Sequence, residues 1–201
     1  MTVNLIDRFL TIKQVLREKL QLVGVSCLLI ACKYEEIYPP ALKEFAAICD
    51  YAYTTNQILD TEADILVTLD YKLTHTSAYR FFERFSLIAD LESKAQMFAR
   101  YLIESTFLES SMLKYKNSLL AAGAIFLVNK IFSKNRWTPV LAFHTGFSES
   151  EVKRCAKDIF FIVQKSDKLA LRAVKKKFSS SKYMQVSKYK MEKIPKSQNR
   201  N

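Results

Sequence analysis

The chain has 201 residues with only 3 glycines and 4 prolines, which indicates one or two small domains built mainly from long helices. Its formal charge of +11 is concentrated in residues 165–201, where twelve Lys and Arg outnumber two acidic residues, so residues 1–164 are nearly neutral. A basic tail on a neutral body is usually solvated, and this distribution argues against specific nucleic-acid binding.

The first half of the chain begins with two predicted helices. In residues 1–12, apolar side chains recur at helical spacing and indicate an amphipathic helix. Residues 20–32 are almost all apolar or small, and a helix without a polar face is buried in a core. At roughly 1.5 Å per residue this run is too short to span a bilayer, and we expect no membrane-spanning segment. The run turns polar at residues 33–36, and the prolines at 39–40 end it.

A capped helix completes the first half. A short helix is predicted over residues 42–49. Thr54 and Gln57 then have the spacing of a capping box, and the flanking Tyr53 and Ile58 form a hydrophobic staple. We expect the apolar side of the helix that follows to contain Ile58, Leu59, Ala63, Leu66 and Leu69.

The second half is also predicted to be helical. Thr76 or Ser77 caps a helix whose apolar residues are Tyr79, Phe82, Phe85 and Leu87. Further helices are predicted over residues 91–108, 117–132, 137–142 and 148–163. No sustained period-2 run or hairpin signal indicates a strand. From Phe178 onward the sequence is rich in Lys and Ser, which is typical of a tail that is mobile unless it packs on the body.

The two halves share a plan. Ser148 and Glu151 form a second capping box, 94 residues after Thr54 and its partner Gln57. The sequence therefore predicts an all-α protein made of a duplicated bundle of about five helices per repeat, with one helix missing at the start. The predicted divisions are 1–72, 73–165 and a basic tail over 166–201.

The sequence offers little to an enzyme hypothesis. His75 and His144 are isolated, and the chain has no glycine-rich phosphate loop and no HExxH or GxSxG motif. The four cysteines form no CxxC pair and no Cys/His cluster, which is typical of reduced thiols in an intracellular protein. We therefore predict no catalytic residues, no metal site and no cofactor.

A family resemblance rests on residues 33–40, which read KYEEIYPP, together with VNLIDRFL and LREKLQLVGVSCLLIA before them and YTTNQILDTEADIL after them. This combination strongly resembles the cyclin box, nearest to the mitotic A/B-type cyclins and most of all to the B-type. The likeness covers nearly the whole chain, including AVKKKFSSSKYMQVS near the C-terminus. It implies a tandem cyclin-box fold of two five-helix bundles. The first helix of the family's first bundle would precede Met1, so we expect an N-terminally truncated member.

The resemblance also implies a function. Cyclins are regulatory subunits that bind and activate cyclin-dependent Ser/Thr protein kinases, and the B-type likeness implies control of the cell cycle at the G2/M transition, in nucleus and cytoplasm. Lys33 and Glu62 match the Lys/Glu pair that holds backbone groups around the αC helix of the kinase. Lys is a donor and Glu an acceptor, so together they can satisfy both kinds of backbone group. Tyr34, Leu66 and Tyr71 match positions that add apolar contact area there.

The second repeat lacks one member of this pair. Lys130 corresponds to Lys33, but Ala156 stands where the first repeat has Glu62. The first repeat is therefore the expected kinase-binding half. Without the resemblance, Lys33 and Glu62 would be interpreted as ordinary solvated charges.

A second site is implied at the start of the central helix. Arg17, Leu20 and Gln21 match part of the family's substrate-docking patch, a shallow apolar groove for RxL-type peptides. The helix that forms the other wall would precede Met1, so we expect weakened docking. Two alternatives stay open for the whole chain: a transcription-factor-IIB-like DNA-binding protein, since that family uses the same tandem fold, and a helical scaffold.

Overall fold

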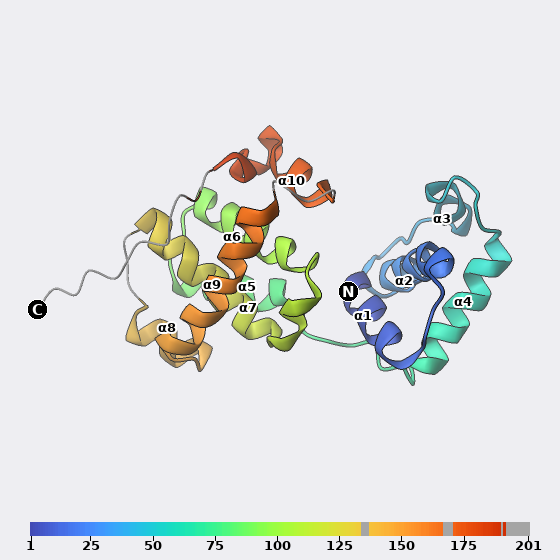
Figure 1. Ribbon diagram of the computed structural model, residues 1–201, viewed down its shortest axis with the longest axis horizontal. Coiled ribbons are helices and arrows are strands. Elements are labelled where there is room, and N and C mark those ends of the chain that lie inside the picture. The colour runs from blue at the N-terminus through green and yellow to red at the C-terminus, as the bar shows by residue number, and fades with distance from the viewer. Residues whose placement is uncertain (134–136, 167–170, 190, 192–201) are drawn as a thin grey trace, which may run out of the picture. The chain divides into compact units, whose positions relative to one another are not determined.

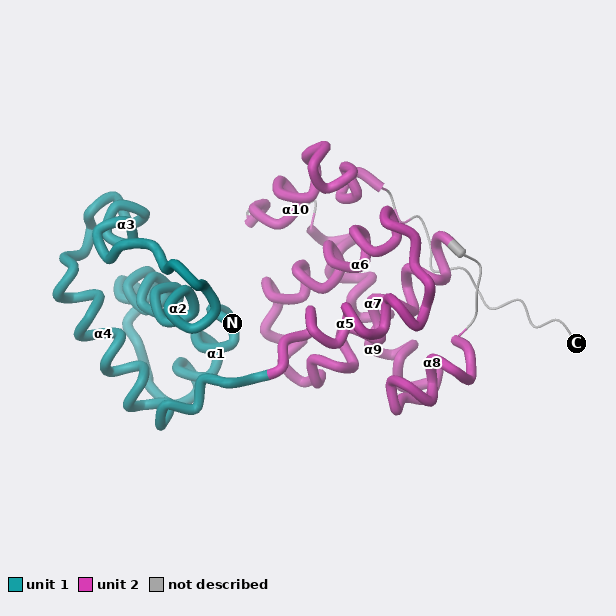
Figure 2. The backbone as a smooth tube through the Cα atoms, turned by 180° about the vertical axis from the view of Figure 1, so that it is seen from behind, with its two compact units in different colours: residues 1–75 teal, residues 76–201 magenta. Residues whose placement is uncertain are grey.

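The computed structural model describes residues 1–133, 137–166, 171–189 and 191, and within these ranges it is built from helices and connecting segments without a strand (Figure 1). The chain divides into two compact units, residues 1–75 and 76–201 (Figure 2). The first unit contains α1 (Thr2–Ile12), α2 (Leu20–Glu35), α3 (Leu42–Ile48) and α4 (Thr55–Thr68). The second contains α5 (Ala78–Ile88), α6 (Ser93–Thr106), α7 (Asn117–Val128), α8 (Pro139–Thr145), α9 (Glu149–Lys165) and α10 (Ala173–Phe178).

The first unit is organised around α2, as the apolar run predicts (Figure 2). One side of α2 packs on α1 and α4 in a core that contains Val23, Cys27 and Ile30 from α2. Another side packs on α3 and the start of α4. Because two different faces of α2 are buried, the helix has no room for a polar face along most of its length.

One stripe of α2 is less covered than the rest. Leu20 is exposed and Leu28 is half-buried. A Cβ atom added to Gly24 would meet nothing within 4 Å. The absence of a helix at the start of the first repeat stays a prediction.

The second unit is organised around α7, which packs against α5, α6 and α9 (Figure 1). All residues from Leu120 to Val128 are buried. Gly123 permits the closest approach, because a Cβ atom there would lie 3.0 Å from Cys155 Sγ and 3.3 Å from the backbone nitrogen of Ala156. The predicted helix over 117–132 ends as an α-helix at Val128 and continues as one wide turn, Asn129–Ser133.

Both predicted capping boxes are confirmed. Thr54 Oγ1 accepts the Gln57 N–H at 3.2 Å, and Gln57 Oε1 accepts the Thr54 N–H at 2.9 Å. In the second unit Ser148 Oγ accepts the Glu151 N–H at 3.4 Å, and a carboxylate oxygen of Glu151 accepts the Ser148 N–H at 2.9 Å. Each box pairs two N–H groups that helix geometry leaves without a partner, and so fixes where α4 and α9 begin.

The predicted apolar side of α4 is partly wrong. Leu59 and Ala63 are exposed, whereas Ile65 is fully buried. The buried residues of α4 and its C-cap are Ile58, Glu62, Ile65 and Leu69. In α5, Phe82 and Phe85 are buried as expected, but Tyr79 and Leu87 are exposed.

Part of the predicted tail packs on the second unit. Within residues 171–189, Phe178 and Val186 are buried, and α10 lies against α6. The ring of Tyr189 contacts the rings of Phe98 and Phe132 at centroid distances of 5.6 and 5.4 Å. Of the basic segment that the sequence sets apart at 166–201, residues 167–170, 190 and 192–201 lie outside the described residues.

Three general expectations can be compared with this fold. Among the described residues, no helix is both long and apolar enough to cross a membrane. All four cysteines are free, and burial raises the pKa of Cys27 and of Cys155 to about 12, so both thiols stay protonated at neutral pH. In the described ranges, no group of three or more His, Cys, Asp and Glu side chains could hold a metal ion.

Candidate functional site

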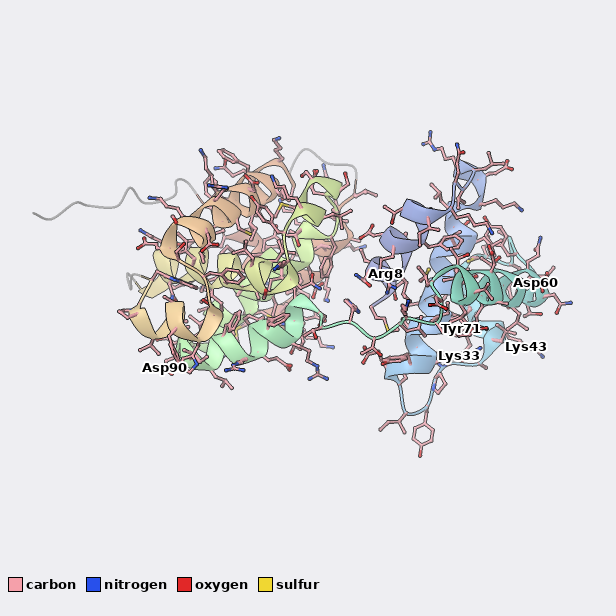
Figure 3. All side chains as sticks on the ribbon, turned by 90° about the horizontal axis from the view of Figure 1, so that it is seen from below. Arg8, Lys33, Lys43, Asp60, Tyr71 and Asp90 are labelled. Carbon is pink, nitrogen blue, oxygen red and sulfur yellow. The ribbon has the colours of Figure 1, made fainter. Side chains whose placement is uncertain are left out.

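The C-terminal end of α2 contacts the middle of α4 through one ion pair. Lys33 Nζ lies 2.8 Å from each carboxylate oxygen of Glu62. The side chain of Lys33 is 48% exposed and that of Glu62 is 11% exposed, so the cation lies at the surface and the anion lies beneath it. The two residues that the resemblance pairs as a donor and an acceptor are therefore adjacent on one side of the first unit (Lys33 labelled in Figure 3).

The position of Glu62 follows from the register of α4. The capping box fixes the start of the helix at Thr55, and Ile58, Glu62 and Ile65 then fall on the side that faces α2. Ser26 on α2 donates a hydrogen bond of 3.1 Å to the carbonyl oxygen of Ile58, which joins the two helices one turn away. A carboxylate on a buried stripe requires a partner, and Lys33 provides it.

Tyr34 extends this region to the segment after α4. Its hydroxyl lies 2.6 Å from Thr74 Oγ1, and its ring is half-exposed. Leu66 is half-buried against the core, and the Tyr71 N–H donates to its carbonyl oxygen at 2.9 Å. Tyr71 is 67% exposed. The structure thus brings Lys33, Tyr34 and Glu62 together with the 66–74 segment.

The loop after α2 contains exposed apolar residues that the sequence prediction did not assign to the site. Ile37 and Tyr38 are 88% and 91% exposed. These two apolar side chains follow Lys33 and Tyr34 closely in the chain and are candidate contact residues beside them. The signal was present in the sequence, since Ile37 and Tyr38 stand between acidic residues and the helix-ending prolines.

The second predicted patch lies at the other end of α2. Arg17 belongs to a 3₁₀ turn, Arg17–Lys19, that leads directly into α2, and the side chains of Leu20 and Gln21 follow. All three residues are exposed. A hollow of about 360 Å³ opens beside this turn, lined by other residues, including Phe9, Val15, Leu16 and Leu22.

The corresponding positions of the second unit, 130 and 156, do not form an equivalent of the Lys33–Glu62 pair. Lys130 lies over the ring of Phe126, 5.5 Å from its centroid. Ala156 is buried in the core, next to Gly123. A carboxylate at position 156 would be buried in that contact, which explains why the second repeat has a small apolar residue there.

Asp158 on α9 has structural partners. Asp158 accepts hydrogen bonds of 2.8 Å from Tyr115 Oη and from Lys114 Nζ. These contacts, the bond from Lys114 most of all, hold the pKa of Asp158 below its usual value. They fasten the turn before α7 to α9 and present no reactive group.

Two family models match the chain. One, described as "Cyclin, N-terminal domain", matches residues 1–74, and the other, described as "Cyclin, C-terminal domain", matches residues 76–192. Cyclin-B1-3 of Arabidopsis thaliana is 42% identical over 180 residues, which are 89% of this chain and 44% of that protein. G2/mitotic-specific cyclin-B of Dictyostelium discoideum is 35% identical over 189 residues, which are 93% of this chain and 43% of that protein.

The chain therefore spans less than half the length of these curated relatives. Among solved structures, a viral cyclin from herpesvirus saimiri superposes with a TM-score of 0.69. The likeness covers 79% of this chain and 72% of the viral one at 20% sequence identity, and it supports the predicted tandem fold alone.

Proposed function

The chain belongs to the cyclin family, and from this premise we propose that it is a regulatory subunit that binds and activates a cyclin-dependent Ser/Thr protein kinase. The single observation that carries the proposal is the Lys33–Glu62 pair, which presents a surface cation above a nearly buried anion. The protein would supply no chemistry of its own. It would act by binding the active conformation of the kinase more tightly than the inactive one.

The contact would use polar and apolar parts together. After pairing with Glu62, the ammonium of Lys33 keeps a donor for a partner's backbone carbonyl, and the carboxylate of Glu62 keeps acceptor directions for an N–H group. Tyr34, Leu66 and Tyr71 would surround this polar centre and exclude water, as apolar residues around an interface centre do. Holding αC of the kinase inward lets its Glu pair with the Lys that positions the ATP phosphates.

A reconstitution experiment tests the function itself. The purified chain is titrated onto a purified cyclin-dependent kinase, and phosphorylation of histone is measured. We expect activity to rise to saturation with the chain. A kinase that neither binds the chain nor gains activity at micromolar concentrations would contradict the proposal.

We propose the timing and location from the relatives. One relative is named as G2/mitotic-specific, and the B-type likeness supports a role at the G2/M transition, with the protein in the nucleus and the cytoplasm. The DNA-binding alternative gains no support, because the comparisons are with cyclins and no observation favours a nucleic-acid surface.

A weaker proposal concerns substrate docking. Arg17, Leu20 and Gln21 would contact an RxL-type peptide at the start of α2, where all three are exposed. Titration of a fluorescent RxL peptide onto the chain tests this. We expect weak binding that Leu20→Ala reduces further, and binding unaffected by Leu20→Ala would exclude this patch.

A further inference from the structure

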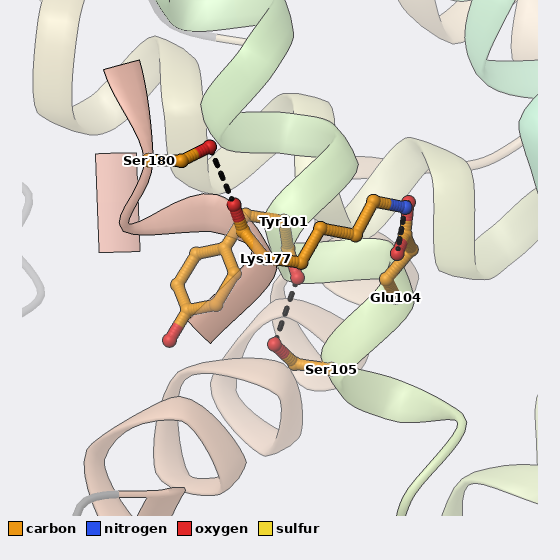
Figure 4. Close-up of polar contacts among 5 residues, drawn as sticks. All are labelled: Tyr101, Glu104, Ser105, Lys177 and Ser180. Atoms are coloured by element: carbon orange, nitrogen blue, oxygen red, sulfur yellow. Dashed lines mark hydrogen bonds and ion pairs between the residues drawn. The ribbon is translucent and has the colours of Figure 1, made fainter. Parts of the chain in front are cut away.

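Residues 173–189 pack on α6 through the buried side chains of Phe178 and Val186, the ring of Tyr189 and one ion pair. Phe178 is fully buried between Tyr101 and Tyr183, with ring centroids 5.5 and 5.0 Å away. Next to it, Lys177 Nζ lies 2.8 and 2.7 Å from the two carboxylate oxygens of Glu104 on α6 (Figure 4). The buried ring supplies apolar contact area, and the ion pair fixes the direction of α10.

Ser180 joins this helix to the turn that follows it. Its exposed hydroxyl donates a hydrogen bond of 3.1 Å to the carbonyl oxygen of Lys177, in the last turn of α10 (Figure 4). Its own carbonyl oxygen accepts N–H groups from Tyr183 and Gln185, both at 3.1 Å. Met184 and Gln185 have φ near +52°, a left-handed conformation that is unfavourable for residues other than glycine. The turn therefore depends on the docked state to hold its shape.

Three consecutive lysines, 175–177, lie three to five positions before Ser180, and Lys182 lies two positions after it. Kinases select substrates partly by such charge patterns. We propose that Ser180 is a phosphorylation site for a Ser/Thr kinase that selects basic residues on the N-terminal side of its serine, and that the phosphate releases residues 173–189 from α6. In the reaction Ser180 Oγ attacks the γ-phosphorus of ATP, the bond from that phosphorus to the β-phosphate oxygen breaks, ADP leaves, and the hydroxyl proton passes to the kinase's base.

Three physical effects of the phosphate oppose the docking of the segment on α6. The esterified Oγ has no proton, so its bond to the Lys177 carbonyl is lost. The phosphate dianion lies at the C-terminal end of α10, where the helix dipole disfavours negative charge. It also competes with Glu104 for the ammonium of Lys177, because charge-assisted bonds to phosphate are strong.

Release would change a neighbouring surface of the second unit. Met184 lines a hollow of about 400 Å³ together with residues of α5 and α6, among them Phe82, Met97 and Arg100. Undocking removes Met184 from that wall. Phosphorylation of Ser180 would therefore alter the surface around Arg100 as well as the position of residues 173–189. The proposed phosphorylation is independent of the proposed kinase-activating function.

The test uses the full chain, ATP and a purified basophilic Ser/Thr kinase, with phosphorylated residues located by mass spectrometry. We expect phosphate on Ser180 and its loss in Ser180→Ala. A kinase active site binds its substrate segment in an extended conformation, so residues 173–189 must leave α6 before Ser180 can react. Docking of this segment on α6 should therefore slow phosphorylation. Glu104→Gln should raise the initial rate about two- to fivefold, the effect of one partly exposed ion pair.

Hydrogen exchange of residues 174–188 then measures release. Exchange should be faster in the phosphorylated chain and in Ser180→Glu than in the unmodified chain. Ser181→Glu is the matched control, because it adds the same charge at the start of the next 3₁₀ turn, Ser181–Tyr183, and should change exchange less. If the kinase phosphorylates an isolated peptide of residues 173–189 but not Ser180 in the full chain, the assignment of Ser180 as a phosphorylation site of this protein is wrong. Unchanged exchange after phosphorylation would overturn the release.

Discussion

Lys33 and Glu62 are 29 residues apart in the chain, and the ammonium of one lies 2.8 Å from both carboxylate oxygens of the other. The Lys33–Glu62 ion pair is already formed in the chain without a partner, so a partner would bind a preformed polar centre. Preorganisation of this kind reduces the entropy lost on binding. The same pair contributes to the fold, because Glu62 is nearly buried and Lys33 is its partner.

The structural contribution can be measured by a double-mutant cycle. Lys33→Met leaves the Glu62 carboxylate without its cation and should destabilise the first unit, whereas Lys33→Met with Glu62→Gln should recover part of the loss. We expect a coupling energy of about 1–2 kcal/mol from urea unfolding. The pair of Lys13 and Asp64, whose side chains are 47% and 42% exposed, is the control and should couple by less than about 1 kcal/mol. Equal coupling energies for the Lys33–Glu62 and Lys13–Asp64 pairs would contradict the difference in burial between them.

The two capping boxes predict matched losses in the two units. Thr54→Ala should lower the free energy of unfolding of the first unit by about 1 kcal/mol, and Ser148→Ala should do the same for the second. Each variant removes the side-chain acceptor of one N–H at a helix start. Thr55→Ala, one residue inside α4, should have a smaller effect. Circular dichroism during urea unfolding is the measurement, and a Thr55 effect as large as that of Thr54 would count against the cap.

Replacing the glycine of each central helix with alanine should change the stability of the protein in opposite directions. Gly123→Ala places a methyl group 3.0 Å from Cys155 Sγ and close to the α9 backbone, and overpacking of this kind costs about 1–3 kcal/mol. At Gly24 the added methyl meets nothing within 4 Å, so the helix propensity of alanine should stabilise α2 by about 0.5–1 kcal/mol. Thermal unfolding of the two variants checks both signs. A stabilising Gly123→Ala would show that α7 and α9 are less tightly packed than the structure has them.

The contacts of Asp158 predict a pH dependence. Lys114, and then Tyr115, lower the pKa of this carboxyl group in the folded chain. A carboxyl group with a depressed folded pKa stabilises the fold above its unfolded pKa of about 4 and loses that contribution as the pH falls through the folded value. Asp158→Asn should therefore lower the free energy of unfolding by about 1 kcal/mol at pH 7, after allowance for solvent screening. The difference between variant and parent should shrink below about pH 4, and a difference that stays constant down to pH 2 would contradict the assignment.

Local chemistry explains which parts of the fold the sequence predicts well. The helix starts at Thr55 and Glu149 can be predicted from the sequence, because a capping box involves residues only three apart. The central helices could be predicted because an apolar run without a polar face, too short to span a bilayer, is buried in a core. The packing of Phe178 could not be predicted from the sequence, because the few apolar residues of this Lys-rich segment give no periodic signal.

The candidate site was predictable only in part. The spacing of Ile58, Glu62 and Ile65 in the sequence places the acid on the buried stripe of α4, whereas the predicted apolar side contains the exposed Leu59 and Ala63. The contact between Glu62 and Lys33 depends on how α4 packs on α2, which no local pattern fixes. The resemblance supplied the pairing, and its role toward a kinase stays a prediction.

The dissociation constant of the chain for a cyclin-dependent kinase, measured by calorimetry, tests the central claim most directly. The double variant Lys33→Ala/Glu62→Ala is compared with Lys13→Ala/Asp64→Ala, which removes the more exposed ion pair of the same unit. We predict that the first variant loses about 2–5 kcal/mol of binding free energy, as truncation of a buried polar contact does, while the second binds like the parent. Equal affinity of both variants and the parent would contradict the account.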